Sequence, residues 1–169
     1  PFMVLSRDKA SAVRQRFDAA HELLHVLAHR SVPDKRLNTK ADNKLIEEQA
    51  HYFAGALLLP AEQFSRELWA PTLDAMVAAK DRWKVSVGVM IKRCENLGMI
   101  DSDAAQRLWI NYTRRGWRDG EPLDGKIEKE RPRLLRRSVE LVLNEKVQSV
   151  SQILGAVNLK AHDVEELCD

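Results

Sequence analysis

Apolar residues recur at steps of three and four along most of the chain, which is the spacing of one face of an α-helix. The pattern predicts a long helix over residues 11–29 and a second over residues 45–59, which Pro60 ends because proline cannot continue a helix. Residues 30–44, between the two, have little apolar content and several turn-forming residues, so they are predicted to be a loop. Such a loop is long enough to fold the second helix back against the first.

Seven shorter segments show the same periodicity, and several are bounded by residues that cap helices. Helices are therefore predicted over residues 61–68, 71–79, 86–97, 101–115, 133–144, 150–157 and 161–167. Residues 2–5 read instead as a short strand, and a single strand cannot satisfy its own backbone groups. The predicted fold class is mainly α, as an α+β fragment that we expect to be missing sequence upstream.

These elements group into four predicted parts. Residues 1–68 hold the strand and both long helices and are expected to form the core domain. Residues 69–118 form a helical extension, and residues 119–132 form a linker rich in glycine, proline and aspartate. Residues 133–169 are expected to form a small C-terminal helical bundle.

Composition excludes several classes of protein. The chain of 169 residues is 44% hydrophobic and 31% charged, as in ordinary globular domains, and its net charge of +2 gives no strong field toward nucleic acid or an anionic membrane. The longest apolar run, residues 54–59, is too short to span a bilayer, and no secretory signal is visible. The two cysteines form no CxxC pair, which fits a reducing compartment. We therefore expect a cytoplasmic protein without a membrane partner.

Arginines cluster at residues 131–137, where neighbouring glutamates dilute their charge. A solvated helix face is the favoured interpretation of this segment. Contact with nucleic acid is the alternative, and steep salt dependence of binding would indicate it.

The first long helix carries His21-Glu22-Leu23-Leu24-His25, an HExxH motif. Histidines four residues apart lie one turn apart on the same helix face, so both imidazoles can reach one zinc ion at about 2.1 Å per bond. The glutamate between them can take a proton from a water at the open coordination position. The motif therefore predicts His21 and His25 as metal ligands and Glu22 as the general base.

A catalytic zinc needs a third protein ligand. His29 follows on the same column as His21 but lies about 12 Å beyond it, too far to share the ion, so it is expected to support the ligands or to end the helix. The second helix offers Glu47 and, less favourably, Glu48. Glu47 lies on the rim of the apolar stripe in one column with His51, which is expected to hydrogen-bond a ligand from behind.

Two segments now resemble a known family. The segment RFDAAHELLH (residues 16–25), with His29 beyond it, and the segment EEQAHYFAGALLLP (residues 47–60) are similar to the ImmA/IrrE (M78-like) zincin metallopeptidases. The hallmarks of that family are RFxxAHExxH, then ExxANxFA and an LLxP ending. The resemblance covers roughly residues 1–65 and is highly specific there.

The resemblance implies a zincin-like core over residues 1–68 with Glu47 as the third zinc ligand. This sequence departs from the pattern at Leu24, where glycine is usual, and at His51, where asparagine is usual. Longer members carry an upstream Xre-type helix-turn-helix domain. The resemblance therefore implies a helix-turn-helix repressor as protein substrate or partner, with DNA contacted only through a domain that this chain lacks.

Two functions follow as expectations. The first is a zinc-dependent peptidase domain of a bacterial transcriptional regulator, a hydrolase in which Glu22 acts as base. The second is a non-enzymatic regulatory or sensing module that uses the peptidase scaffold to bind a partner or ligand. The group that stabilises the oxyanion stays open among Tyr112, Arg14 and Arg16.

Overall fold

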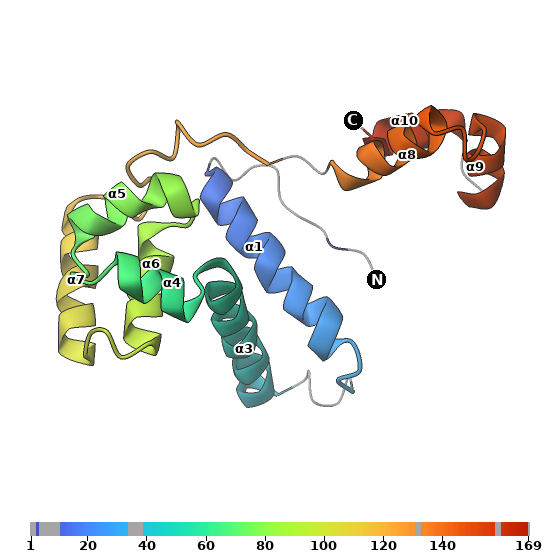
Figure 1. Cartoon of the computed structure of the whole chain (residues 1–169). Coiled ribbons are helices and arrows are strands. Elements are labelled where there is room, and N and C mark those ends of the chain that lie inside the picture. The colour runs from blue at the N-terminus through green and yellow to red at the C-terminus, as the bar shows by residue number, and fades with distance from the viewer. Residues whose placement is uncertain (1–2, 4–10, 34–38, 131–132, 158–159, 169) are drawn as a thin grey trace. The chain divides into compact units, whose positions relative to one another are not determined.

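The computed structural model describes residues 3, 11–33, 39–130, 133–157 and 160–168, with Leu167 and Cys168 described by their backbone alone. The chain divides into two compact units, Pro1–Lys129 and Glu130–Asp169. Every regular element among the described residues is a helix (Figure 1), which confirms the mainly α prediction. The strand predicted at residues 2–5 lies outside the described residues, except for Met3. None of the described helices is both long and apolar enough to cross a membrane.

The first unit opens with two helices that lie side by side (Figure 1). Helix α1 (Ala12–Leu24) continues into a π-helical turn, η1 (His25–His29), and packs against α3 (Lys40–Leu58). The residues that this pair buries along its length are small, since Ala20, Ala50 and Ala54 are all buried. Small side chains let two helices approach closely. Longer side chains on the flanks of α1 and α3 can therefore meet across the contact.

Helix α3 begins earlier than predicted. The Thr39 hydroxyl accepts a hydrogen bond of 3.1 Å from the backbone N–H of Asp42, which caps the helix start. Asp42 also lies in the first turn, where an acidic side chain is favourable. The predicted loop over residues 30–44 was therefore wrong from residue 40 onward, because these first turns are polar all round and show no apolar stripe.

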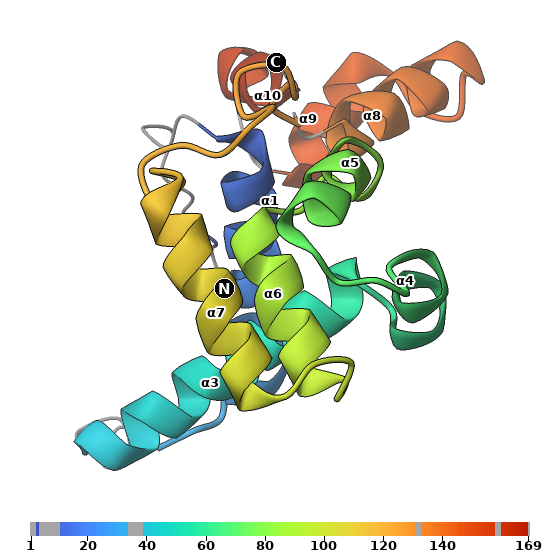
Figure 2. The ribbon, with the colours of Figure 1, turned by 90° about the vertical axis from the view of Figure 1, so that its left-hand side faces the viewer.

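Four shorter helices follow in the first unit, and three of them start at a residue whose side chain caps the helix. They are α4 (Ala61–Glu67), α5 (Leu73–Trp83), α6 (Val87–Asn96) and α7 (Ser102–Arg114), of which α6 and α7 lie side by side in Figure 2. Helix α5 runs four residues past its predicted end. It stops at Lys84, which adopts a left-handed conformation (φ 52°) usually taken by glycine, so the sequence gives no stop signal there.

The main hydrophobic core lies under these four helices. Its fully buried side chains include Phe64, Met76, Met90 and Ile91. Cys94 is buried in the same core, where burial raises the pKa of its thiol to about 12, so the thiol stays protonated near neutral pH. The contact between α1 and α3 is not part of this core, which meets α3 through α6.

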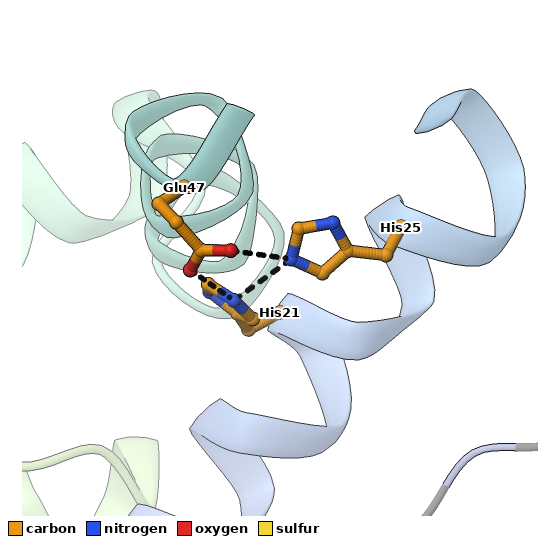
Figure 3. A group of neighbouring side chains, drawn as sticks. All are labelled: His21, His25 and Glu47. Atoms are coloured by element: carbon orange, nitrogen blue, oxygen red, sulfur yellow. Dashed lines mark hydrogen bonds and ion pairs between the residues drawn. The ribbon is translucent and has the colours of Figure 1, made fainter. Parts of the chain in front are cut away.

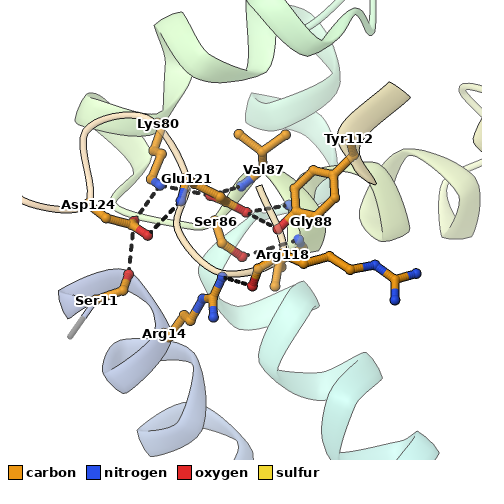
Figure 4. Close-up of polar contacts among 11 residues, drawn as sticks. Ser11, Arg14, Lys80, Ser86, Val87, Gly88, Tyr112, Arg118, Glu121 and Asp124 are labelled. Atoms are coloured by element: carbon orange, nitrogen blue, oxygen red, sulfur yellow. Dashed lines mark hydrogen bonds and ion pairs between the residues drawn. The ribbon is translucent and has the colours of Figure 1, made fainter. Parts of the chain in front are cut away.

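The segment after α7 folds onto this core through buried charges (Figure 4). Glu121 is only 6% exposed and accepts hydrogen bonds from Lys80 Nζ at 2.7 Å and Tyr112 Oη at 2.9 Å. The same carboxylate accepts hydrogen bonds from the backbone N–H groups of Val87 (2.8 Å) and Gly88 (3.1 Å), at the start of α6. Residues 119–132 were predicted to be a linker, yet Glu121 joins α5, α6 and α7.

Asp124 extends this network to α1. It accepts hydrogen bonds from Lys80 Nζ at 2.6 Å and from the hydroxyl of Ser11 at 2.9 Å (Figure 4). Burial by itself would raise the pKa of Asp124, but the hydrogen bonds from Lys80, Ser11 and the Glu121 backbone outweigh it and lower the pKa below 3.8, the ordinary value. Asp124 is therefore ionised in the folded chain at any pH near neutrality.

This lowered pKa predicts a loss of stability in acid. A carboxyl whose folded pKa lies below its unfolded pKa stabilises the fold above the unfolded value and loses that contribution as the pH falls through the folded value. We expect the free energy of unfolding to decline as the pH drops below about 3.8. Urea titrations at several pH values would measure it. The decline should be shallower in Asp124→Asn, and an identical slope in both proteins would contradict the assignment.

The second unit holds three short helices, close to their predicted ranges. These are α8 (Leu134–Asn144), α9 (Val150–Val157) and α10 (Ala161–Cys168), and α8 contacts α10. Among the residues of this unit whose side chains are described, none is buried. The subdivision of the chain at residues 68 and 118 stays a prediction.

Candidate metal centre

Three side chains from two helices converge on one point (Figure 3). His21 comes from α1, His25 from the first position of η1, and Glu47 from the second turn of α3. The Nε2 atoms of the two histidines are 3.0 Å apart. Glu47 places Oε2 at 3.1 Å from His21 Nε2 and Oε1 at 3.5 Å from His25 Nε2. No other such group of metal-binding side chains occurs among the described residues.

The spacing of these atoms fits a zinc ion. Ligand atoms at about 2.1 Å from a tetrahedral zinc lie about 3.4 Å from one another. The three separations of 3.0, 3.1 and 3.5 Å are close to this value. Two histidines and a carboxylate also form a donor set that catalytic zinc accepts, with a fourth position left for water. The residues therefore fit the metal without a rearrangement of the helices.

The protonation state of His21 also suits a metal ligand. Burial lowers the pKa of His21, and the neighbouring His51 lowers it further, against the opposing effect of Glu47. The ring is therefore neutral near pH 7, which is the form that binds metal. Its Nδ1 atom is buried and has no hydrogen-bond partner among the described residues. The ring is oriented instead by an edge-to-face contact with His51, at 4.5 Å between centroids.

His25 is oriented by a chain of hydrogen bonds through His29. With the Gln49 amide oriented as in the structure, its Oε1 can only accept, so His29 Nε2 donates to it at 3.0 Å. In a neutral His29 the other nitrogen, Nδ1, then accepts from His25 Nδ1 at 2.9 Å. The Nε2 atom of His25 then carries no proton and faces His21 and Glu47. The relay holds His25 in the tautomer that a metal requires.

Removal of this relay should weaken metal binding without abolishing it. Loss of an outer hydrogen bond to a metal-binding histidine typically costs 10- to 100-fold in metal affinity, and we expect a decrease of about this size for His29→Ala. His29→Gln keeps an acceptor and should lose less. Competition with a chromophoric zinc chelator would measure the affinities. His162→Ala, an exposed histidine of α10, is the matched control, and an equal loss there would contradict the role of His29.

His51 takes a different position from the one expected. Its Nδ1 donates to the backbone carbonyl of Glu47 at 2.7 Å, so it bonds its own helix rather than a ligand side chain. Its ring contacts His21 and lies 5.8 Å from the ring of Phe17. His51 therefore acts on the group through ring packing and by fixing the turn that carries Glu47.

The remaining candidates lie around the group. Glu22 is half-buried, next to His21, and does not belong to the converging set; its charge acts on His21. Glu48 is exposed and pairs with Lys44 at 3.7 Å, outside the set. The three candidates for the oxyanion have other partners, since Tyr112 donates to Glu121, Arg14 to the Arg118 carbonyl and Arg16 to the Trp83 carbonyl.

Sequence reasoning missed Gln49. This residue stands in the run Glu47-Glu48-Gln49, which is typical of a solvated first turn, and only the approach of α1 shows that its amide meets His29. A glutamine two residues after a predicted ligand points about 200° around the helix, so spacing alone argues against a shared site. The contact arises because His29 reaches across from the π-helical turn.

Comparison with known proteins gives one match. A family model, Peptidase M78, described as the IrrE N-terminal-like domain, matches residues 1–95. Searches of the curated proteins and of the solved structures found no match. The matched range covers more than half of the 169 residues and includes His21, His25 and Glu47. The chain therefore belongs to the M78 peptidase family and carries an IrrE N-terminal-like domain.

Proposed function

We propose that this chain is the zinc-dependent peptidase domain of a bacterial transcriptional regulator. The observation that carries the proposal is the convergence of His21, His25 and Glu47 on one point, with separations that suit a tetrahedral ion. Membership of the M78 family supports the same chemistry. A neutral His21 and the fixed tautomer of His25 add to the support, because both rings present a lone pair to the same point.

The proposed division of labour gives each residue one task. His21, His25 and Glu47 would hold the zinc ion, which would supply the Lewis acidity that makes a bound water more acidic. Glu22 acts as the general base, taking a proton from the attacking water onto its carboxylate and passing it to the amide nitrogen of the leaving peptide. His29 and His51 position the ligands. No residue is assigned to the oxyanion.

The proposed substrate is a protein, namely a helix-turn-helix repressor in the same cytoplasm. This extension rests on the family resemblance of residues 16–25 and 47–60 rather than on any contact in the structure. DNA would be contacted through a separate helix-turn-helix domain outside this chain. Cleavage assays against the helix-turn-helix regulators encoded nearby would test this part directly.

Glu22→Gln tests the peptidase proposal. General acid–base catalysis typically contributes 10²- to 10⁴-fold, so we expect cleavage to slow at least a hundredfold while zinc binding is unchanged. The substitution keeps the size of the side chain and removes its basicity. Glu48→Gln, the same change on an exposed residue outside the group, is the control. Equal cleavage by Glu22→Gln and the parent protein would refute the assigned base.

A regulatory module without catalysis is the second candidate. It is favoured by one observation, a cavity of about 970 Å³ bordered by Gln49 and His51, which has room for a small ligand beside His21, His25 and Glu47, the proposed metal group. An experiment in cells distinguishes the two functions. If the regulatory phenotype persists in Glu22→Gln, binding rather than cleavage is the better account.

A further inference from the structure

The cavity beside the metal group has aromatic walls. It has a volume of about 970 Å³, is partly open to solvent, and is lined by residues of α1, α3, α6 and α7. Phe17, Tyr52, Trp109 and Tyr112 contribute four rings to its surface. Binding sites for small molecules are typically of this size, mostly apolar, with a few polar groups that fix the ligand's orientation. The walls therefore suit the apolar body of a small ligand.

One wall of the cavity carries a buried guanidinium group. Arg93 is 5% exposed, and its Nε donates to the backbone carbonyl of Leu59 at 3.0 Å. Its Nη1 is buried and has no hydrogen-bond partner among the described residues. The Tyr52 ring has its centroid 5.8 Å from Arg93 Cζ. A buried charge without a carboxylate partner is costly, so an anion in the cavity would stabilise this arrangement.

The other charges of the cavity wall are already balanced. Lys92 pairs with Glu95 at 2.8 Å, and Glu48 pairs with Lys44 at 3.7 Å. Within the described part of the chain, no such ion pair involves Arg93. The wall thus presents a single uncompensated positive charge, which matches a monoanion better than a phosphate with two negative charges.

We propose that this cavity binds a small monocarboxylate whose body is aromatic or aliphatic. The carboxylate pairs with Arg93 through a charge-assisted hydrogen bond from its terminal nitrogens, because Nε is already bonded to the Leu59 carbonyl. The apolar body packs between Tyr52 and Trp109. The acid is either a free small molecule or the C-terminal carboxylate of a peptide. This site is separate from the metal ligands and goes beyond the proposed peptidase function.

The site adjoins the metal group through two shared residues. Gln49 and His51 line the cavity, while Gln49 also accepts from His29 and His51 packs against the His21 ring. An occupant of the cavity therefore contacts the residues that orient His21 and His25. The proposal itself does not need a metal, so it can fail or hold independently of the peptidase proposal.

Gly55 offers a way to close the cavity. It lies on α3, lines the cavity, and a Cβ built on it would meet no atom within 4 Å. A side chain at this position therefore starts from open space at its Cβ, and Gly55→Leu is expected to occupy part of the cavity. Gly55→Ala is its matched control, because it makes the same backbone change with a single methyl group and favours the helix as well.

Calorimetric titration of the full chain with 3-phenylpropionate tests the proposal. We expect saturable binding, at least tenfold weaker binding of the neutral 3-phenylpropanamide, and at least tenfold weaker binding of the acid to Gly55→Leu than to Gly55→Ala. The indole N–H resonance of Trp109 should shift on binding, and that of Trp69, an exposed residue outside the cavity, should not. No binding at about 10 mM acid would overturn the proposal.

A zinc ion can bind a carboxylate directly, so the titration is repeated after a chelator has removed any metal. Binding should persist and remain sensitive to Gly55→Leu. Loss of binding with the metal, together with equal binding by both Gly55 variants, would place the acid on the ion and overturn the proposal. A peptide ending in phenylalanine that binds tighter than N-acetylphenylalanine indicates a polypeptide source, and equal binding indicates a free acid.

Discussion

His25→Ala is expected to reduce the zinc content from one ion per chain to none. The substitution removes one of three protein ligands and leaves His21 and Glu47, whose nearest atoms are 3.1 Å apart. Two ligands and solvent do not make a closed site for zinc, whose protein sites use three or four donors. Elemental analysis of freshly purified protein, followed by dialysis against zinc, would measure the stoichiometry.

Circular dichroism shows whether the variant has lost only the metal or has also unfolded. His25 is the first residue of η1 and lies outside both buried clusters, so the secondary-structure content measured by circular dichroism should be unchanged. His162→Ala, which removes an exposed histidine from the second unit, should retain one zinc. A full zinc content in His25→Ala, or none in the parent protein, would remove the ground for the peptidase proposal.

Glu121→Gln is expected to lower the free energy of unfolding by about 3 kcal/mol, since breaking a buried ion pair typically costs 3–5 kcal/mol and Asp124 still faces the cation. The Glu121 carboxylate is buried against Lys80, which is itself fully buried. The amide nitrogen of glutamine is a donor and cannot accept from both backbone N–H groups of α6. Chemical denaturation followed by tryptophan fluorescence would measure the change.

Two further variants show whether the charge is responsible. Asp81→Asn breaks an exposed pair with Lys84 and should change stability by less than about 1 kcal/mol. Lys80→Met combined with Glu121→Gln should lower the free energy of unfolding by less than the sum of the two single effects. The double variant has removed both charges of the pair, so neither charge is left buried without its partner. Strict additivity of the two single effects would show that the ion pair is not the source.

The convergence of His21, His25 and Glu47 was predictable because two local sequence patterns determine it. HExxH fixes His21 and His25 on one helix face with Glu22 beside His21, and an apolar stripe places the second helix against the first. The structure brings Glu47 to the histidines as these patterns predict, while its role as a ligand stays a prediction. Helix starts were also close at three capping residues, Thr72, Ser86 and Asp101, although not at Thr39.

Features that depend on distant partners were not predictable. Glu121 lies among glycine and proline, as in a linker, and its burial follows only from the position of Lys80, 41 residues earlier. Arg93 lies within an amphipathic helix, where arginine is usually exposed, so the sequence does not indicate that it is buried beside Leu59. The π-helical turn at His25–His29 likewise has no mark in the residues themselves.

The small buried residues of α1 and α3 restrict which substitutions the contact between the two helices can accept. Ala50 and Ala54 are completely enclosed, so a bulkier side chain at either position would act as a wedge between the two helices. An added methyl group would push the two helices apart. Glu47 would then move away from the imidazoles, because it lies on the same helix as Ala50 and Ala54. The distance from Glu47 to the two imidazoles therefore depends on two alanines that are not among the proposed ligands.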